Sequence, residues 1–256
     1  MRISVITVSF KASSTIEDTI VSVKSQQYQD LDYIVIDGGS SDGTIKIIKQ
    51  HPDIVTYWIS EPDNGIYDAM NKGLSKASGE IVGFLNADDI YVGHDVLDKV
   101  AAVFSDPTVD ACYSDLVYVS PNDLTRVVRY WRSSPYREGL FAKGWCPPHP
   151  TFFVRKHIYE KFGGFDLTYT IGNDIEIMMR LLARHKIKSV YIPETTVKMR
   201  IGGTSNRNFS NVFRQNIEII RAARNNNIPL KPFLFIFSKM LSRLGQFLRK
   251  PAKVSS

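Results

Sequence analysis

The sequence predicts an α/β fold in which a Rossmann-like, mostly parallel sheet is flanked by helices. Its 256 residues, 43% of them hydrophobic, suit one globular domain. Through residues 1–104, apolar runs of strand length alternate with stretches of helical period. Strands that alternate with helices pair in parallel through right-handed crossovers. Ligands of such sheets bind beyond the carboxyl ends of the strands, and a polar cluster follows each of these apolar runs.

The first half of the chain supplies four predicted strands and the helices between them. The strands are the runs "RISVITV", "LDYIVID", "IVTYWIS" and "EIVGFLN", at residues 2–8, 31–37, 54–60 and 80–86. The connecting segments predict helices at 13–26, 44–51 and 67–77. This layout is typical of nucleotide-binding α/β domains.

The alternation changes after a further predicted helix at 94–104. Next come a strand pair at 111–120 and 125–132, a helix at 174–185 and a strand at 187–193. The strand pair predicts a small antiparallel extension of the sheet. We therefore divide the chain into a main domain at 1–204, with halves at 1–104 and 105–204, and a basic, amphipathic helical extension at 205–256.

Charge is distributed unevenly along the chain. The net charge is +6, yet from residue 201 to 256 there are ten Lys or Arg and a single acid, Glu218, so this segment carries +9 and the remainder −3. A localised basic segment favours a polyanionic partner, either a membrane surface or nucleic acid.

Composition argues against several protein classes. The sequence has no run of 18 apolar residues that would predict a membrane span. Its first residues lack the apolar length and the small-residue cleavage site of a signal peptide. The two cysteines, Cys112 and Cys146, have no metal-binding spacing and argue against a disulfide scaffold. We therefore expect a cytoplasmic protein in a reducing compartment.

The stretch "IDGGSSDGT" follows the second predicted strand. Its glycines are typical of a turn, and Asp42 or Thr44 is suited to cap the next helix. A turn does not explain Asp37 at the strand end, where a carboxylate can accept hydrogen bonds from a base or a ribose. The stretch lacks the G-x-G-x-x-G order, which disfavours a nicotinamide dinucleotide.

The acidic doublet Asp88–Asp89 follows the fourth predicted strand, which has the composition of a strand buried on both faces. A surface turn is the simpler interpretation. Adjacent carboxylates beside other polar strand ends favour a divalent cation, because Mg²⁺ and Mn²⁺ prefer oxygen ligands and often share them with substrate phosphates.

Two further stretches contain candidate site residues. Asp174 and Glu176 begin a predicted helix, where Asp174 is suited either to the first turn or to the role of a general base. In "GWCPPHPTFF", His149 is either a metal ligand, an acceptor contact or a packed loop residue. Trp145 is suited either to a sugar-stacking wall or to the core.

The segment at 229–250 has large apolar side chains at three- and four-residue spacing, flanked by Lys239, Arg243, Arg249 and Lys250. This pattern favours a helix in a membrane interface, where each cation near anionic lipid contributes about 1 kcal/mol. The alternative is a helix packed on the main domain or on a second subunit. Nucleic acid is disfavoured, because the cations lie among bulky aliphatic residues and no known reader motif is present.

Four stretches together resemble the inverting family 2 glycosyltransferases, which have a GT-A fold. They are "SVITVSF", "DYIVIDGGSSDGT", "SEPDNGIYDAMNKGLSKASGEIVGFLNADD" and "GNDIEIMMRL", and they span residues 2 to about 204. The similarity is strongest to bacterial enzymes that build capsule, colanic-acid-like or O-antigen polysaccharides. It makes 1–104 the nucleotide-sugar-binding half and 105–204 the acceptor-binding half.

The resemblance also implies residue roles. The residues implied to bind the donor nucleotide are Val8, Ser9, Phe10, Asp37, Asp63, Gly65, Asn71 and Asp88. Asp89 would be the direct metal ligand, with Asp88 nearer the ribose, and Asp174 would be the catalytic base. Met70 stands where many relatives have an Arg that holds the nucleotide, which leaves the donor's base open.

We therefore predict a metal-dependent inverting glycosyltransferase of the hexosyltransferase class. It would use Mn²⁺ or Mg²⁺ and move a sugar from a nucleotide-diphosphate donor to a lipid-linked glycan of bacterial surface polysaccharide or lipopolysaccharide, as a peripheral protein on the inner face of the cytoplasmic membrane. The alternative is a non-catalytic nucleotide-sugar-binding or assembly subunit, and a homo-oligomer stays open. A nucleotidyltransferase is disfavoured, because "SFKASSTIED" lacks the Gly and Arg of an activation loop.

Overall fold

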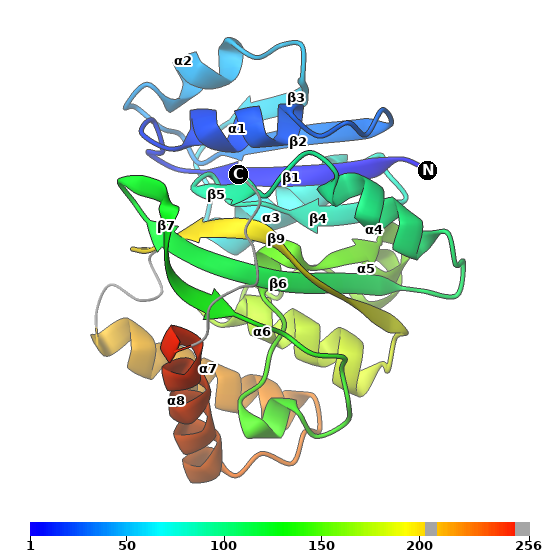
Figure 1. Ribbon diagram of the computed structural model, residues 1–256, viewed down its shortest axis with the longest axis vertical. Coiled ribbons are helices and arrows are strands. Elements are labelled where there is room, and N and C mark those ends of the chain that lie inside the picture. The colour runs from blue at the N-terminus through cyan, green and yellow to red at the C-terminus, as the bar shows by residue number, and fades with distance from the viewer. Residues whose placement is uncertain (203–208, 249–256) are drawn as a thin grey trace.

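A computed structural model describes residues 1–202 and 209–248 and has the predicted α/β architecture (Figure 1). Within these residues nine strands form one sheet in the order β3-β2-β1-β4-β8-β6-β9-β5, and β7 pairs with β6. The strands are β1 (Ile3–Ser9), β2 (Leu31–Asp37), β3 (Val55–Ser60), β4 (Ile81–Phe84), β5 (Asp89–Tyr91), β6 (Ala111–Ser120), β7 (Asp123–Trp131), β8 (Phe153–Arg155) and β9 (Ser189–Arg200).

Helices cover both faces of the sheet. The α-helices are α1 (Ile16–Lys24), α2 (Thr44–Lys49), α3 (Ile66–Lys76), α4 (Val96–Phe104), α5 (Lys156–Phe162), α6 (Asn173–Met178), α7 (Phe209–Asn225) and α8 (Pro232–Leu248). Short 3₁₀ turns span Phe141–Lys143 and His149–Thr151, and α6 continues as a π-helix over Met179–Arg184.

The parallel part of the sheet sets the position of the polar strand ends. β1 pairs in parallel with β2 and β4, and β2 pairs in parallel with β3. The carboxyl ends of the four predicted strands therefore lie at one edge, as expected. The antiparallel extension is also confirmed, because β7 pairs antiparallel with β6.

The core has two layers because strands such as β1 are buried on both faces. Ile3 and Val5 pack with residues of α1, α2 and α4, while Ile6 and Val8 pack with residues of α3, α5, α6 and α7. This alternation follows from the two-residue period of a strand.

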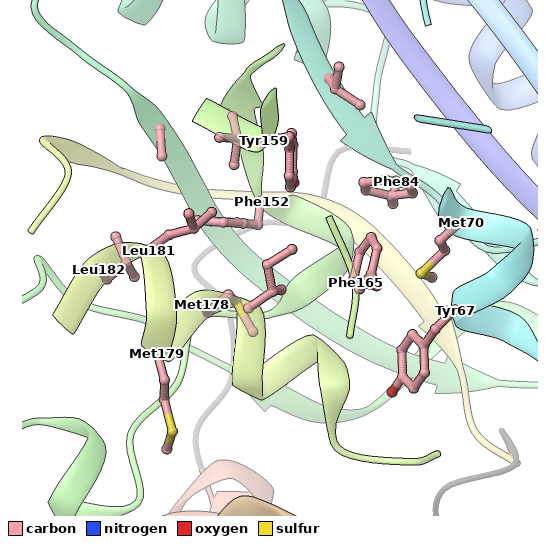
Figure 2. Packing of buried hydrophobic residues seen from close by; sticks show 14 of the residues in the cluster. Tyr67, Met70, Phe84, Phe152, Tyr159, Phe165, Met178, Met179, Leu181 and Leu182 are labelled. Atoms are coloured by element: carbon pink, nitrogen blue, oxygen red, sulfur yellow. The ribbon is translucent and has the colours of Figure 1, made fainter. Parts of the chain in front are cut away.

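The second layer joins the two halves of the main domain. Figure 2 shows Tyr67 of α3 and Phe84 of β4 near Phe165, which precedes α6. The Tyr67 and Phe165 rings stack with their centroids 5.7 Å apart, and Phe84 meets Phe165 edge to face at 5.2 Å. Such contacts fix the position of α6 relative to α3 and β4.

Sequence patterns missed three short elements. β5 and β8 have three residues each, too few to show a period, and α5 has seven. In contrast, the predicted strand at 187–193 extends as far as Arg200 in β9, which pairs with β6 and β5.

The helical extension consists of α7 and α8, seen below the sheet in Figure 1. The predicted boundary near residue 204 lies outside the described residues, as do Arg249 and Lys250. Among the described helices, none combines the length and apolar character needed to cross a membrane.

Candidate active site

The ends of β1, β2 and β3 meet around the fully buried carboxylate of Asp37. It accepts hydrogen bonds from the hydroxyls of Ser9 (3.0 Å), Ser40 (2.6 Å) and Ser60 (2.6 Å) and from the N–H groups of Gly39 (3.1 Å) and Ser40 (2.8 Å). Burial raises the pKa of Asp37, but these bonds outweigh burial and lower it below the ordinary value. Asp37 thus shapes the loop after β2. Its contact with a base stays a prediction, one that requires it to exchange a partner.

The open side of this edge is formed by Phe10, Gly38 and Asp63. The Phe10 side chain is 61% exposed. A Cβ on Gly38 would lie 2.5 Å from Oδ2 of Asp63 and 3.4 Å from the Phe10 ring, so any larger residue here would displace the Asp63 side chain. The N–H of Gly65 donates to Oδ1 of Asp63 at 2.9 Å. An exposed ring and a carboxylate beside bare backbone suit the face and polar edge of a nucleobase. Sequence reasoning missed Gly38, although the "GG" pair marks it.

The doublet lies in the turn from β4 into β5. The N–H of Asp89 donates to the carbonyl of Asn86 at 3.0 Å, and the Asn86 amide donates to Oδ2 of Asp89 at 3.2 Å. Arg200 at the end of β9 donates to the carbonyl of Asp88 at 2.9 Å, and the Thr19 hydroxyl donates to the carbonyl of Asp89 at 2.8 Å. Arg200 and Thr19, which no sequence pattern singled out, thus fix the backbone of the doublet.

The doublet's side chains fit a hard divalent cation. Asp89 is fully buried, and its Oδ1 has no hydrogen-bond partner among the residues that the structure describes. Burial, and next the charge of Asp88, raises the pKa of Asp89 well above its ordinary value. Asp88 is only half-buried, so it is the carboxylate that reaches solvent. In the described ranges no group of three or more His, Cys, Asp or Glu suits a metal ion.

Asp174 lies in the first turn of α6, and its Oδ1 also has no partner among the described residues. Burial raises the pKa of Asp174 to about 6. Smaller effects in the opposite direction come from the N–H of Ile175, the ammonium of Lys239 and the hydroxyl of Tyr67. A carboxyl group with a pKa near neutrality is suited to accept a proton. Sequence reasoning did not identify Tyr67, whose hydroxyl also accepts the N–H of Asn173 at 3.2 Å.

Glu218 on α7 holds the loop that leads into α6. Its carboxylate accepts the Thr170 hydroxyl at 2.7 Å and the N–H groups of Thr170, Ile171 and Gly172 at 3.0, 2.9 and 2.9 Å. The only acid of the basic segment therefore positions the helix that carries Asp174. Its isolation among cations was the signal that sequence reasoning left unused.

Tyr118 on β6 relates the doublet to Asp174. Burial raises the pKa of this phenol, the charges of Asp89 and Asp174 raise it further, and Arg129 and Arg243 lower it. The charges of carboxylates from both halves of the chain therefore reach this phenol.

Two residues with open roles lie in packed or paired surroundings. His149 lies between Phe84 and Phe165, with both ring distances 5.8 Å, and burial lowers its pKa to about 4. Glu176 forms an ion pair with Arg180 at 3.1 Å. Both arrangements favour structural roles, so contacts of these two residues with an acceptor or metal stay predictions without structural support.

Trp145 differs from His149 and Glu176 because its polar atom lacks a partner. Its ring packs against Tyr113, Tyr136 and Phe141, while its buried Nε1 has no hydrogen-bond partner in the described residues. An acceptor contact at Trp145 therefore stays a prediction.

Two residues that we expected to contact the donor form contacts within the protein. The Val8 side chain packs in the core. The Asn71 amide donates to the carbonyl of Phe165 at 2.8 Å and accepts its N–H at 2.8 Å, which ties α3 to the acceptor half. A nucleotide contact by Asn71 stays a prediction that requires it to exchange these partners.

Comparison with known proteins gives a consistent result. Residues 4–162 match the model of the family described as Glycosyl transferase family 2. An uncharacterized glycosyltransferase of Mycobacterium tuberculosis is 34% identical over 180 residues, 70% of this chain and 68% of its own. A PGL/p-HBAD biosynthesis glycosyltransferase of Mycobacterium bovis is 27% identical over 208 residues, 79% of this chain and 78% of its own.

Solved structures share the fold. A mannosyltransferase from Pyrobaculum calidifontis, in complex with GDP-Man and Mn²⁺, has a TM-score of 0.66 and 21% identity, covering 96% of this chain and 70% of its own. S. aureus TarS 1–349 in complex with UDP-GlcNAc has a TM-score of 0.67 and 16% identity, covering 93% and 70%.

Proposed function

The chain belongs to glycosyl transferase family 2, and we propose that this GT-A glycosyltransferase moves a sugar from a nucleotide diphosphate to a glycan hydroxyl with inversion at the anomeric carbon. One observation carries the proposal. The acidic doublet and a separate carboxylate, Asp174, each have a buried oxygen with no hydrogen-bond partner among the described residues, and burial raises the pKa of Asp174 to about 6. One centre suits the donor's diphosphate and the other the acceptor's proton.

Asp174 would act as the general base. Its unpartnered Oδ1 accepts the proton of the acceptor hydroxyl while the hydroxyl oxygen attacks the anomeric carbon. The bond from that carbon to the diphosphate breaks as the new glycosidic bond forms on the opposite face. A single displacement inverts the configuration and leaves no sugar on the enzyme, so one carboxylate beside the sugar is sufficient.

The donor would lie along the carboxyl edge of the parallel strands. Phe10 and Asp63 flank the base over Gly38, and the loop held by Asp37 shapes the floor. Asp88 and Asp89 would hold Mn²⁺ or Mg²⁺, which when bound supplies Lewis-acid neutralisation of the departing diphosphate. A solved relative of the same fold holds GDP-Man with Mn²⁺.

The acceptor would be a lipid-linked glycan in surface polysaccharide synthesis, with the protein peripheral on a membrane. A biosynthetic glycosyltransferase of M. bovis whose name refers to PGL/p-HBAD is among the relatives. On α8 eight large apolar side chains are exposed, whereas Phe235 is buried, and such an exposed apolar side suits a helix lying in a membrane interface.

The direct test is a donor screen with Mn²⁺ or with EDTA. UDP-, GDP- and dTDP-sugars are incubated with the full chain, and release of the nucleotide diphosphate is measured. We expect Mn²⁺-dependent release from one nucleotide class. A non-catalytic binding or assembly subunit would bind a nucleotide without releasing its diphosphate, and that result would overturn the proposal.

The roles of the carboxylates are separable by substitution. Asp174→Asn should lower transfer about 10²- to 10⁴-fold and retain Mn²⁺ binding, followed by electron paramagnetic resonance. Asp88→Asn and Asp89→Asn should each weaken Mn²⁺ binding itself. If Asp174→Asn kept normal turnover, the base would be another group.

A further inference from the structure

Helix α8 packs on the domain with its polar side and exposes its apolar side. Phe235 is its buried apolar anchor, while Lys239, Arg243 and Gln246 are half-buried. These positions lie three and four residues apart and therefore share one helix face. The exposed apolar side chains are Phe233, Leu234, Ile236, Phe237, Met240, Leu241, Leu244 and Phe247. This corrects the expectation that the cations of this helix flank the apolar stripe toward lipid.

Contacts fix the polar face of α8 against α7, β7 and the loop at Gly144. The ammonium of Lys239 donates to Oδ1 of Asn216 at 2.8 Å, and a Cβ on Gly144 would lie 3.0 Å from the Lys239 backbone. Nε of Arg129, on β7, donates to Oε1 of Gln246 at 2.6 Å. The cations therefore lie between α8 and the domain.

Three cations gather at this junction. The guanidinium of Arg129 lies 4.3 Å from the Tyr118 ring centroid and 5.9 Å from that of Phe247. Burial, and then the charge of Arg243, lowers the pKa of Lys239 to about 8. Burial, and to a smaller extent Arg243, also lowers the pKa of Arg129. In residues 1–202 and 209–248, none of the three forms an ion pair with a carboxylate.

Such a cluster is costly unless an anion completes it. Partly buried like charges repel, and a buried charge requires a partner of opposite sign. Among the described residues, Asp174 is a carboxylate whose charge raises the pKa of Lys239. We have proposed that Asp174 accepts the proton of the acceptor hydroxyl. The three cations can therefore bind an anionic group of a ligand.

The apolar, cationic and carboxylate groups at this junction follow one another in an order that suits a lipid joined to a sugar through an anionic group. The exposed apolar side of α8 comes first, then the cations on its inner face, then Asp174 beside Lys239. A lipid-linked sugar has the same order of apolar chain, phosphate and hydroxyl. Arg is suited to phosphate because its fork donates two hydrogen bonds.

We propose that Arg129, Lys239 and Arg243 bind the phosphate or diphosphate group that links the acceptor glycan to its lipid. This inference rests on the proposed function, since it deepens the substrate class of the same site. The cations hold the anionic link at the membrane surface, and the first sugars then lie beside Asp174. The acceptor is therefore a short glycan, with its reacting hydroxyl close to the link.

The test is direct binding without turnover. Farnesyl diphosphate, inorganic pyrophosphate and farnesol are titrated by calorimetry into the full chain in EDTA, so that the donor's cation is absent. We expect farnesyl diphosphate to bind at least tenfold more tightly than either fragment. Arg243→Gln and Lys239→Gln should each weaken it about tenfold or more. Arg126→Gln, an exposed cation on the same strand as Arg129, is the matched control and should not change it.

Other sources of phosphate give other outcomes. If Arg243→Gln weakens UDP or GDP binding with Mn²⁺ but leaves farnesyl diphosphate unchanged, the cations serve the donor and the proposal fails. If it weakens only binding to phosphatidylglycerol vesicles, the cations meet bulk lipid and the proposal also fails. Donor release is measured in parallel. Its absence while farnesyl diphosphate binds would sink the proposed function and leave this site standing.

Discussion

At the residue scale, the unusual feature is a carboxyl group kept partly protonated near neutral pH. Burial raises the pKa of Asp174 to about 6, and only its ionised form accepts a proton. We expect kcat/KM at saturating Mn²⁺ to rise about tenfold per pH unit below about pH 6 and then to level off. A pH–rate profile with a saturated donor measures this. A flat profile between pH 5 and 7 would contradict the assignment.

The same residue predicts a shift and a stability effect. Lys239 lowers the pKa of Asp174, so Lys239→Gln should move the acidic limb of the profile to higher pH. The pKa of Asp174 is higher in the folded chain than in the unfolded chain. Its protonated form therefore contributes stability below the ordinary carboxyl pKa, and this contribution is lost as pH rises through about 6. Asn cannot ionise, so Asp174→Asn avoids the stability that the wild type loses when Asp174 becomes charged. At pH 7.5 the variant should therefore unfold at an equal or higher urea concentration than the wild type. A variant that lost both activity and stability would indicate a structural carboxylate.

At the scale of elements, α7 supports the helix that carries the base. Glu218 accepts four short hydrogen bonds from Thr170, Ile171 and Gly172. Glu218→Ala would leave buried N–H groups unpaired, so it should lower the free energy of unfolding by about 1–3 kcal/mol and reduce kcat while leaving Mn²⁺ binding intact. Urea denaturation and Mn²⁺ titration measure the two effects.

Arg214 provides the matched control on the same helix. It pairs with Glu218 at 3.6 Å, but its side chain is 61% exposed, and exposed ion pairs contribute about 0–1 kcal/mol. Arg214→Ala should therefore be much milder than Glu218→Ala. If both variants lowered the free energy of unfolding equally, Glu218 would stabilise the protein through its ion pair with Arg214 and not through its hydrogen bonds to the loop.

At the scale of the whole molecule, the outward apolar side of α8 is the largest exposed apolar group of side chains on one helix of the described residues. Each large apolar side chain buried in lipid contributes about 1.5–3 kcal/mol. Phe237→Glu with Leu244→Glu should therefore reduce flotation with phosphatidylglycerol vesicles by tenfold or more. Because Lys239 faces inward, we expect neutral vesicles to retain a large part of the binding.

Val21→Glu is the control for this surface. Val21 is an exposed apolar residue on α1, an element that does not belong to the α7–α8 extension, and its substitution should leave flotation unchanged. Size-exclusion chromatography of both variants separates lipid binding from self-association. If Phe237→Glu with Leu244→Glu dissociated an oligomer and left flotation intact, a second copy of the chain would be the partner of α8.

Much of the fold was predictable from local patterns, but distant contacts were not. The parallel strands and the polar edge followed from alternation of strands and helices, and β1–β4 confirm them. Arg200 and Glu218 gave no local signal of position, because their partners are 112 and 46 to 48 residues away. His149 and Glu176 show the same limit, since a polar residue type says nothing about the aromatic rings or the ion pair that surround it.

The sequence by itself determined the sheet edge and the two acidic centres, because strand period, turn chemistry and carboxylate spacing are local properties of the chain. Only the tertiary structure decided which long-range partners hold these groups and how α8 is turned. Helical period marks two faces of α8 as apolar and polar without saying which one meets the domain. The contacts of Gln246 with Arg129 and of Lys239 with Asn216 settle that the polar face turns inward, since hydrogen-bond partners far apart in sequence exist only after the chain has folded.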